Sequence, residues 1–314
     1  MKLGELQQLT QNIPDLQGEA LQQWMQNRLR SMGLDPNALY QELEMTSHFA
    51  DTHQDTSYSN ANMQLHSHTF YEILYCCNTC GAEYLIGSER YRLQEGDVVF
   101  VPPSVSHRPL LPENMSTPYT RCVLWLSPEF MALYAGFFSH PFQETRAYPS
   151  LLRTAGTKWE YLGNLFRSGV QETQKLSEGW EAAVIGNAIQ ILTQIRRATT
   201  EQSVHTLKAE KPMLLDQLMA YIEEHYTTRF TIDDMAKHCF VSSSTISHLF
   251  KEKLGVSLYR YVTQRRLIAA KQLIENGSPL DDVSLQTGFQ DYSSFYRAFK
   301  QEYGISPRQY RNLQ

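Results

Sequence analysis

The sequence lacks the features that mark secreted, membrane-spanning and fibrous proteins. It has only five cysteines in 314 residues, an odd number that suits a reducing compartment better than a disulfide framework. No stretch reaches the roughly 18 consecutive apolar residues that a membrane helix needs, and the first residues lack the apolar run of a secretory signal. We therefore expect a cytoplasmic protein with no membrane partner.

One cysteine pair has the spacing of a metal or redox motif without the rest of such a motif. Cys77 and Cys80 form a C-x-x-C, but there is no second pair to complete a zinc site. Asn78 and Thr79 between them, followed by Gly81, are typical of a hairpin turn. We therefore favour a turn over a metal or redox role here.

Positive charge is scarce over the whole chain but unevenly distributed. Lys and Arg number 28 against 33 Asp and Glu, and this net charge of -5 taken alone argues against a polyanion-binding protein. Residues 211–314 carry 13 basic and 11 acidic residues, whereas residues 1–210 carry 15 basic and 22 acidic residues. The two parts, at +2 and -7, are expected to have different partners.

Length and residue pattern divide the chain into about two domains with an extension. Residues 1–60 are Gln-rich with two helical patterns, and we assign them to an N-terminal helical extension and arm. Residues 61–200 begin with short Tyr, Val, Ile and Phe runs separated by turn residues, which predict a sandwich or small barrel, and end in helical patterns. The polar residues 201–211 are the predicted linker to residues 212–314.

The last hundred residues contain an internal repeat. Residues 239–261 align with residues 288–310 at an offset of 49, which matches Phe240 with Phe289, whereas the preceding residues align at an offset of 48. Each copy predicts a short helix, a turn and a second helix that ends at a glycine. This pattern predicts two helix-turn-helix units.

The second helix of such a unit enters the major groove of DNA. These helices are predicted at residues 243–253 and 291–303, joined by one helix over residues 258–275. That helix spans about 27 Å, which can hold two reading helices near the ~34 Å repeat of B-DNA. Residues 251–271 carry a local charge of +5, which favours phosphate contact, although a solvated helix face has the same pattern.

These C-terminal residues resemble the AraC/XylS family of transcription regulators. The resemblance rests on the repeat, on R-R-L-x-x-A-x-x-L from Arg265 to Leu273, and on the closing pattern from Gly288 to Arg311. One departure is Ser284, where alanine is usual in the family; its hydroxyl can bond to the helix backbone. The resemblance implies base contacts at Ser244, Ser247, His248, Tyr292, Ser293, Tyr296 and Arg297, and the basic run adds Arg265 and Arg266 as DNA-contact candidates.

Arg297 is the strongest candidate among these residues. A guanidinium can bind guanine O6 and N7 with two hydrogen bonds, whereas serines discriminate poorly between bases. Helix capping is the alternative role for Ser242 to Ser244. Arg265 is expected to meet phosphate, which would weaken binding to all sequences alike when it is removed.

A polar cluster stands out in the strand-rich half. In an extended strand His66, His68 and Glu72 share one face, and His107 follows later in the chain. The spacing resembles the two cupin motifs, whose His, His, Glu and His residues bind metal and would suit iron, manganese, zinc or nickel. Effector contact, a self-satisfied polar cluster and a metal site all stay open, and we assign no cofactor and no resident metal. Further ligand-binding candidates are Arg108, Arg121 and Trp125.

The predicted protein is thus an α+β two-domain protein. A cupin-like, jelly-roll β-barrel with flanking helices precedes an all-α domain with two helix-turn-helix units. The resemblance implies an effector-responsive activator of sugar or related metabolite genes, and not an enzyme. Its expected partners are promoter DNA, a small-molecule effector, RNA polymerase and a second copy joined through the helix at residues 179–200. The alternatives are a metal-dependent cupin enzyme with a DNA-binding domain and a regulator that responds to a protein partner.

Overall fold

The structure of the chain is a computed structural model that describes residues 45–58, 65–78, 80–112, 117–137, 150–201 and 214–312, with the single residues 24, 27, 28, 31 and 115. Apart from residues 24, 27, 28 and 31, the helical patterns predicted before residue 45 lie outside these residues, as does all of the predicted linker at 201–211 except residue 201.

The chain divides into two compact units. The barrel unit contains Ser47–Glu223 and Ile232–Leu258, and the C-terminal unit contains Glu224–Thr231 and Tyr259–Gln314. These units are defined by which residues lie close together, and this does not show which segments fold on their own. The predicted domain limits therefore stay a prediction. The combination of a β-sheet part and a helical part confirms the predicted α+β class.

The described strands of the barrel unit form two antiparallel sheets. One has the order β1-β7-β2-β5-β8 and the other the order β4-β3-β6, which confirms the predicted strand-rich half. The strands are β1 (Ala50–Ser57), β2 (Tyr71–Cys76), β3 (Glu83–Ile86), β4 (Glu89–Arg92), β5 (Asp97–Val101), β6 (His107–Leu110), β7 (Tyr119–Leu126) and β8 (Leu151–Arg153).

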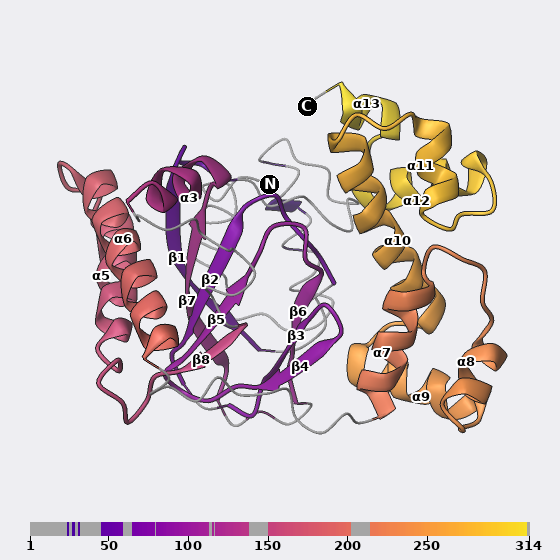
Figure 1. The fold of residues 1–314 in the computed structure, drawn as a ribbon, viewed down its shortest axis with the longest axis horizontal. Coiled ribbons are helices and arrows are strands. Elements are labelled where there is room, and N and C mark those ends of the chain that lie inside the picture. Colours follow the sequence, from indigo (N-terminus) through magenta and orange to yellow (C-terminus); the bar gives the residue numbers. More distant parts are fainter. Residues whose placement is uncertain are drawn as a thin grey trace. The chain divides into compact units, whose positions relative to one another are not determined.

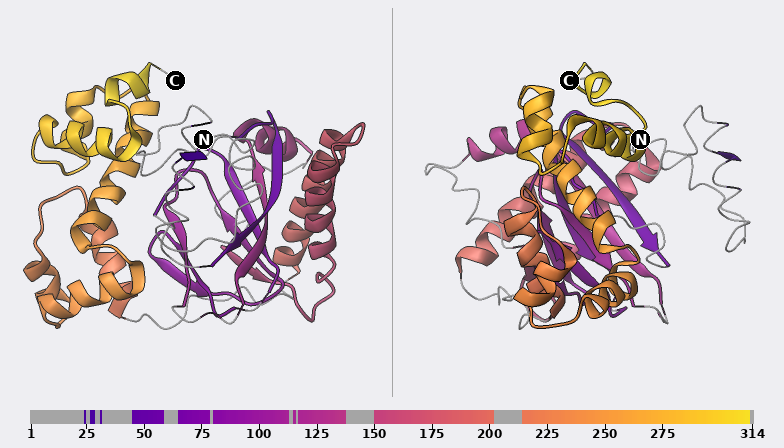
Figure 2. Two further views of the ribbon diagram at one scale, coloured as in Figure 1. Left: turned by 180° about the vertical axis from the view of Figure 1, so that it is seen from behind. Right: turned by 90° about the vertical axis from the view of Figure 1, so that its right-hand side faces the viewer.

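Both faces of the five-stranded sheet are covered. Every residue of β2 is buried, because Ile73 and Tyr75 pack into the main core while Glu72 and Leu74 face the other way. Helices α5 (Leu162–Lys175) and α6 (Trp180–Thr200) lie side by side on the outside of this sheet (Figure 1). The view from behind shows the same arrangement (Figure 2). The sheet therefore separates a helix-packed core from an inner face that carries polar side chains.

The apolar face of α6 has its main partner inside the barrel unit. Val184, Ala188, Ile191, Leu192 and Ile195 are buried in the core shared with the sheet. The neighbouring Ile185 and Ile189 are only partly buried. Self-association through this helix therefore stays a prediction, with a narrower apolar surface than the sequence pattern alone indicates.

Residues 50–57, which the sequence pattern assigned to an arm, form strand β1 and pair with β7 along their whole length. The strand reads A-D-T-H-Q-D-T-S and has none of the large apolar residues that mark the other strands. Its polar groups are accommodated locally: the Thr52 hydroxyl donates to the Val123 carbonyl at 2.7 Å, and the His53 ring meets Trp125 edge-on. A strand that contributes polar side chains to an interior escapes recognition by apolar periodicity.

The segment around Asn78 is not a hairpin, contrary to the prediction. Strands β2 and β3 belong to different sheets, so the chain between them crosses from one sheet to the other. Turn residues such as Asn78 and Gly81 predict a change of direction, but they do not determine which strands pair afterwards. Gly81 does have the left-handed φ of +76° expected of a turn glycine.

Helices form the rest of the described chain. Helix α3 (Pro128–Ala135) follows β7, and α7 (Leu214–His225) precedes the first helix-turn-helix. The first helix-turn-helix consists of α8 (Ile232–His238) and α9 (Ser243–Leu254), in the barrel unit. Helix α10 (Leu258–Glu275) leads to the second, α11 (Leu280–Gln286) and α12 (Tyr292–Tyr303), which is followed by α13 (Pro307–Arg311).

The helix ends follow the predicted signals. Gly255 and Gly304 end α9 and α12 with φ of +69° and +75°, the left-handed geometry expected of a C-cap. The Ser284 hydroxyl donates to the Asp281 carbonyl at 2.8 Å, which confirms the predicted return of this serine to its own helix backbone. Within the described residues, no helix combines the length and hydrophobicity needed to span a membrane.

Candidate functional site

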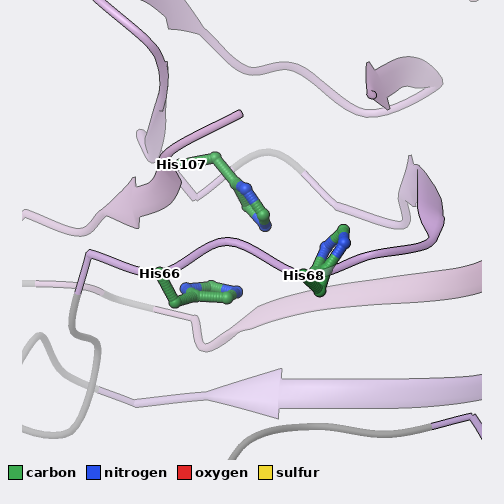
Figure 3. A group of neighbouring side chains, drawn as sticks. All are labelled: His66, His68 and His107. Atoms are coloured by element: carbon green, nitrogen blue, oxygen red, sulfur yellow. The ribbon is translucent and has the colours of Figure 1, made fainter. Parts of the chain in front are cut away.

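Three histidines converge on the inner side of the barrel unit. His66 and His107 form an isolated antiparallel bridge with backbone N···O distances of 3.2 and 2.9 Å, and His68 lies two residues further along the same segment. Each ring offers a nitrogen, and these nitrogens all lie within 4.8 Å of one another (Figure 3). Regular strand begins only at Tyr71, so the bridge, and not one continuous strand, brings His66 to the cluster.

Backbone carbonyls determine which nitrogen of two of these rings carries a proton. His68 Nδ1 lies 2.7 Å from the Phe70 carbonyl, and His107 Nδ1 lies 2.8 Å from the Val105 carbonyl. A carbonyl can only accept, so both Nδ1 atoms must be donors. In the neutral rings the Nε2 atoms then carry lone pairs, and both Nε2 atoms are buried without a hydrogen-bond partner of good geometry among the described residues.

Glu72 on β2 is the carboxylate of the cluster. Its Oε1 accepts a hydrogen bond from Trp125 Nε1 at 2.9 Å, and its Oε2 accepts one from the Tyr84 hydroxyl at 3.3 Å. Its Oε2 also lies 3.2 Å from His107 Nε2 and 3.9 Å from His68 Nε2. Burial alone would raise the pKa of Glu72, but contact with the two imidazoles outweighs burial and holds this pKa well below its ordinary value.

The cluster therefore needs a positive charge or a donor between its members. Burial lowers the pKa of His68, which favours a neutral ring with a lone pair on Nε2. A lone pair that faces a carboxylate oxygen is repulsive unless a proton, a ligand hydroxyl or a metal ion lies between them. The arrangement is therefore suited to receive a hydrogen-bond donor or a cation.

Trp125 and Arg121 contribute to this region in different ways. Trp125 is 1% exposed, and its ring packs against the Phe70 ring with centroids 4.7 Å apart. Because this packing fixes the indole, its N–H holds Glu72 in place. Arg121 pairs with Asp55 of β1 at 3.0 Å. Burial would raise the pKa of Asp55, but Arg121 and His53 lower it to about 2. Whether Arg121 or Trp125 touches an effector stays a prediction.

Sequence reasoning did not identify Tyr84, which contacts the cluster from the second sheet. Tyr84 on β3 bonds to Glu72, and its ring lies nearly parallel to the ring of His107 with centroids 6.3 Å apart. A tyrosine in a strand pattern gives no sign of a partner in another sheet, so only the alternation of β3 could have placed it on an inner face.

Arg108 points away from the cluster, although it follows His107 on β6. It is 1% exposed, and its NH1 donates to the carbonyl of Leu254, the last residue of α9, at 3.0 Å. On the same sheet Arg90 of β4 holds Asp216 of α7 with two hydrogen bonds of 3.0 and 3.2 Å. The three-stranded sheet thus contacts α7, which precedes the first helix-turn-helix, and α9, which is its second helix.

The DNA-contact candidates of the first helix-turn-helix lie on the solvent side of α9. Ser244, Ser247 and His248 are all exposed, and Ile246 between them is fully buried. His248 Nε2 lies 3.4 Å from Glu252. Ser242 caps the helix by accepting from the Thr245 amide at 3.1 Å, so the capping role belongs to Ser242 and leaves the later serines on the outer face.

In the second helix-turn-helix the DNA-contact candidates include large side chains. Ser293 and Arg297 of α12 are exposed, and Tyr292 and Tyr296 are partly buried with ring centroids 6.3 Å apart. Arg297 NH2 lies 3.5 Å from the Ser294 hydroxyl, a contact too long to immobilise the guanidinium. Arg297 is exposed, and its contact with a base stays a prediction.

The basic residues of α10 make contacts within the protein. Arg266 donates to the carbonyls of Tyr226 and Thr228 at 2.7 and 2.8 Å, and the Arg265 guanidinium lies 4.2 Å from the centre of the Tyr226 ring. Arg260 pairs with Glu302 at 2.5 Å. A structural role is therefore established for these arginines, and phosphate contact by Arg265 and Arg266 stays a prediction.

Comparisons with known proteins match both parts of the chain. Residues 48–158 match the AraC-like ligand binding domain, and residues 235–313 match a helix-turn-helix domain. The HTH-type transcriptional activator RhaS of Salmonella dublin is 26% identical over 252 residues, and RhaS of Salmonella arizonae is 27% identical over 252 residues; both alignments cover 78% of this chain and 86% of the relative. The crystal structure of ToxT from Vibrio cholerae O395 covers 85% of this chain and 98% of its own, at 11% identity and a TM-score of 0.35, a loose likeness only.

Proposed function

The chain belongs to the AraC family of DNA-binding transcription regulators, with a ligand-binding domain ahead of its helix-turn-helix domain, and from this premise we propose that its histidine cluster binds the effector. The effector we propose is a sugar or a related metabolite, and the response is transcriptional activation. The curated relatives named above are activators, which supports the direction of the response.

The observation that carries this proposal is a pair of unsatisfied imidazole nitrogens beside a buried carboxylate. His68 Nε2 and His107 Nε2 face Glu72 in a buried region, and all three groups accept hydrogen bonds when the rings are neutral. Adjacent hydroxyl groups of a polyol each supply a donor and also accept, so they would satisfy these atoms together. An effector without hydrogen-bond donors would leave the imidazole nitrogens of the cluster unsatisfied.

A binding screen with a matched pair of variants tests this assignment. Full-length protein is titrated with sugars and sugar acids while its melting temperature is followed, because a ligand that binds the folded state raises this temperature. We expect the shift caused by a stabilising compound to vanish in His107→Ala and to persist in His48→Ala, where an exposed histidine of the same unit is removed. Equal shifts in both variants would place the effector elsewhere.

A divalent metal ion is the second candidate for this cluster. His66, His68 and His107 offer three nitrogens within 4.8 Å of one another, and the Nδ1 bonds of His68 and His107 direct their Nε2 atoms inward. Such anchoring is typical of metal-binding imidazoles, and these residues fit iron, zinc, nickel or manganese. Metal analysis of the purified protein decides: near-stoichiometric metal that is lost in His107→Ala would support it, and substoichiometric metal would favour the polyol.

The first helix-turn-helix has a direct connection to the cluster. Successive residues of a strand point to opposite faces, so His107 faces the cluster while Arg108 holds the end of α9. We propose that effector binding alters β6 and thereby the hold of Arg108 on Leu254. An effector shifts DNA binding only if it binds one arrangement better than the other, and β6 would provide this difference.

The proposed DNA readers are the exposed residues of α9 and α12. Selection of duplexes from a random pool by the full-length protein tests DNA recognition itself. We expect an enriched sequence with contacts in two major grooves, as two reading helices would give. A pool that stays random after selection would contradict sequence-specific binding. RNA polymerase and a second copy joined through α6 are the further partners that we propose.

A further inference from the structure

A pair of thiols in the barrel unit lies apart from both sites described above. Cys122 on β7 is fully buried, and Cys77, which directly follows β2, is partly buried. Their Sγ atoms are 3.6 Å apart. The Cys77 thiol makes hydrogen bonds with Cys122, 45 positions away, and with the Tyr75 carbonyl, and not with Cys80 of the same C-x-x-C motif.

Backbone and side-chain bonds hold the two cysteines in this position. Tyr75 pairs with Cys122 in the β2–β7 register, and the Cys77 amide continues the ladder by donating to the Thr120 carbonyl at 2.9 Å. Asn78 then bonds to the facing strand twice, donating to the Pro118 carbonyl at 2.7 Å and accepting from the Thr120 amide at 3.2 Å. The thiols therefore meet as diagonal neighbours in a fixed register.

The two thiols are chemically unequal. A hydrogen bond from the Cys122 thiol lowers the pKa of Cys77, against the opposing effect of burial and with further help from the Arg167 guanidinium. The same hydrogen bond, together with burial, raises the pKa of Cys122. Thiolate is the reactive form of cysteine, and Cys77 is also the more exposed of the two, so we assign Cys77 as the attacking sulfur and Cys122 as the protonated partner.

We propose that Cys77 and Cys122 form a dithiol that peroxide oxidises to a disulfide. The Cys77 thiolate attacks one oxygen of hydrogen peroxide, the O–O bond breaks, and Cys77 becomes a sulfenic acid as hydroxide leaves and is protonated to water. Cys122 Sγ then attacks the Cys77 sulfur, the S–S bond forms, and the S–O bond breaks. The hydroxide that leaves takes the Cys122 proton, so two thiols are oxidised while one peroxide is reduced to two waters.

Formation of this bond requires the two sulfurs to move closer together. A disulfide needs the sulfurs about 2.05 Å apart, so they must approach by about 1.5 Å from their present contact. Cys77 directly follows the last residue of β2, so the approach takes place at the end of the strand. Cys76 is a poor competitor, because its thiol bonds to the Asn78 carbonyl at 3.2 Å and burial raises its pKa to about 12.

Peptide mapping after mild oxidation tests the proposal on the full-length protein. Reduced protein is treated with hydrogen peroxide, free thiols are blocked with N-ethylmaleimide, and the digest is analysed without reduction. We expect a Cys77–Cys122 crosslink and a mass loss of about 2 Da in the intact chain, both reversed by dithiothreitol. The matched control Cys80→Ser should form the same crosslink to the same extent as the unaltered protein.

A second variant distinguishes the two steps. In Cys122→Ala the sulfenic acid on Cys77 should persist and be trapped by dimedone, with no crosslink. A Cys77–Cys80 or Cys76–Cys80 crosslink as the main product would overturn the proposal. So would full recovery of Cys77 as its maleimide adduct after peroxide treatment, and this readout needs no variant. DNA binding plays no part in the assay, so its outcome is independent of the proposed regulatory function.

Discussion

The two helix-turn-helix units are copies of one sequence pattern, yet the protein builds them differently at the turn. Measured from their first helices they match at an offset of 48: Val241 donates to the Ala236 carbonyl as Phe289 donates to the Ser284 carbonyl. Measured from their second helices, α9 and α12, they match at an offset of 49. The second turn therefore contains one more residue than the first.

This extra residue changes the environment of the turn. At an offset of 48 Phe240 occupies the place of Gly288, and both have left-handed backbones, with φ of +58° and +79°. Phe240 is 95% exposed, whereas Phe289 packs against Phe295 with ring centroids 5.4 Å apart. The sequence alignment of Phe240 with Phe289 is thus wrong in the structure, where Val241 takes the place of Phe289.

The two copies therefore differ in what supports them. The turn of the second copy is packed against the segment at Tyr226, where no side chain would fit on Gly288. The first copy has a strained and exposed turn, and the end of its α9 is held by Arg108 of the barrel. We infer that α12 is firmly supported within its own unit, and that the position of α9 depends on its contact with the ligand-binding domain.

Gly288→Ala should give the largest effect. A Cβ on Gly288 would lie 2.4 Å from the Tyr226 carbonyl oxygen, and its φ of +79° disfavours a side chain. Strain and overpacking together should cost about 2–4 kcal/mol of unfolding free energy. Chemical denaturation of the full chain measures it, with Gly255→Ala as the control, where a Cβ meets no atom within 4 Å. Equal losses in both variants would show that packing at Tyr226 is unimportant.

Arg297→Ala should come next, and it compares the two readers directly. Loss of a bidentate contact to guanine should weaken specific DNA binding by roughly 1–3 kcal/mol and relax base preference at one position. Ser247→Ala on α9 should cost less, because one hydroxyl discriminates bases poorly. Fluorescence anisotropy on the selected duplex measures both. A larger loss for Ser247→Ala would reverse the assignment of the two readers.

Arg108→Ala should loosen only the first copy. Removal of a buried, charged donor leaves the Leu254 carbonyl without this bond, and such bonds contribute about 1.5–3 kcal/mol. Hydrogen exchange should therefore speed up at the end of α9 and stay unchanged in α12. Lys251→Ala is the matched control, because its ammonium reaches the same helix end only weakly, at 3.5 Å from the Gly255 carbonyl, in solvent.

Phe240→Gly should give the smallest effect, and of opposite sign. Glycine relieves the left-handed strain of Phe240 and loses little packing, since the ring is exposed, so stability should rise by about 0.5–1 kcal/mol. Thermal unfolding measures this change. A loss of stability would mean that the Phe240 ring has a partner in the folded protein.

The sequence predicts the helices well because their signals are local. Ser242 and Asp291 cap the first turns of α9 and α12, and Gly255 and Gly304 end these helices, so both helices begin and end within a residue of the prediction. The spacing of residues along the chain also predicts the polar cluster, and the structure brings its members together: His66, His68, Glu72 and His107.

What the sequence does not predict depends on distant partners. Tyr84 meets Glu72 from another sheet, and Arg266 bonds to Tyr226, 40 positions away. The polar side chains of β1 find individual partners on β7, such as the Val123 carbonyl for Thr52 and Arg121 for Asp55, so no apolar period reveals that strand. Pairing between distant segments is set by the assembled fold, and a local pattern contains no information about it.

The base preference of Arg297→Ala tests the account most directly. Duplexes are selected from a random pool by the full-length protein and by this variant, and the enriched sequences are compared. We predict that the unaltered protein enriches a sequence with a guanine that the variant no longer requires, while the other positions keep their preference. Identical preferences at every position, with or without the arginine, would contradict the assignment of α12 as the firm reader of DNA.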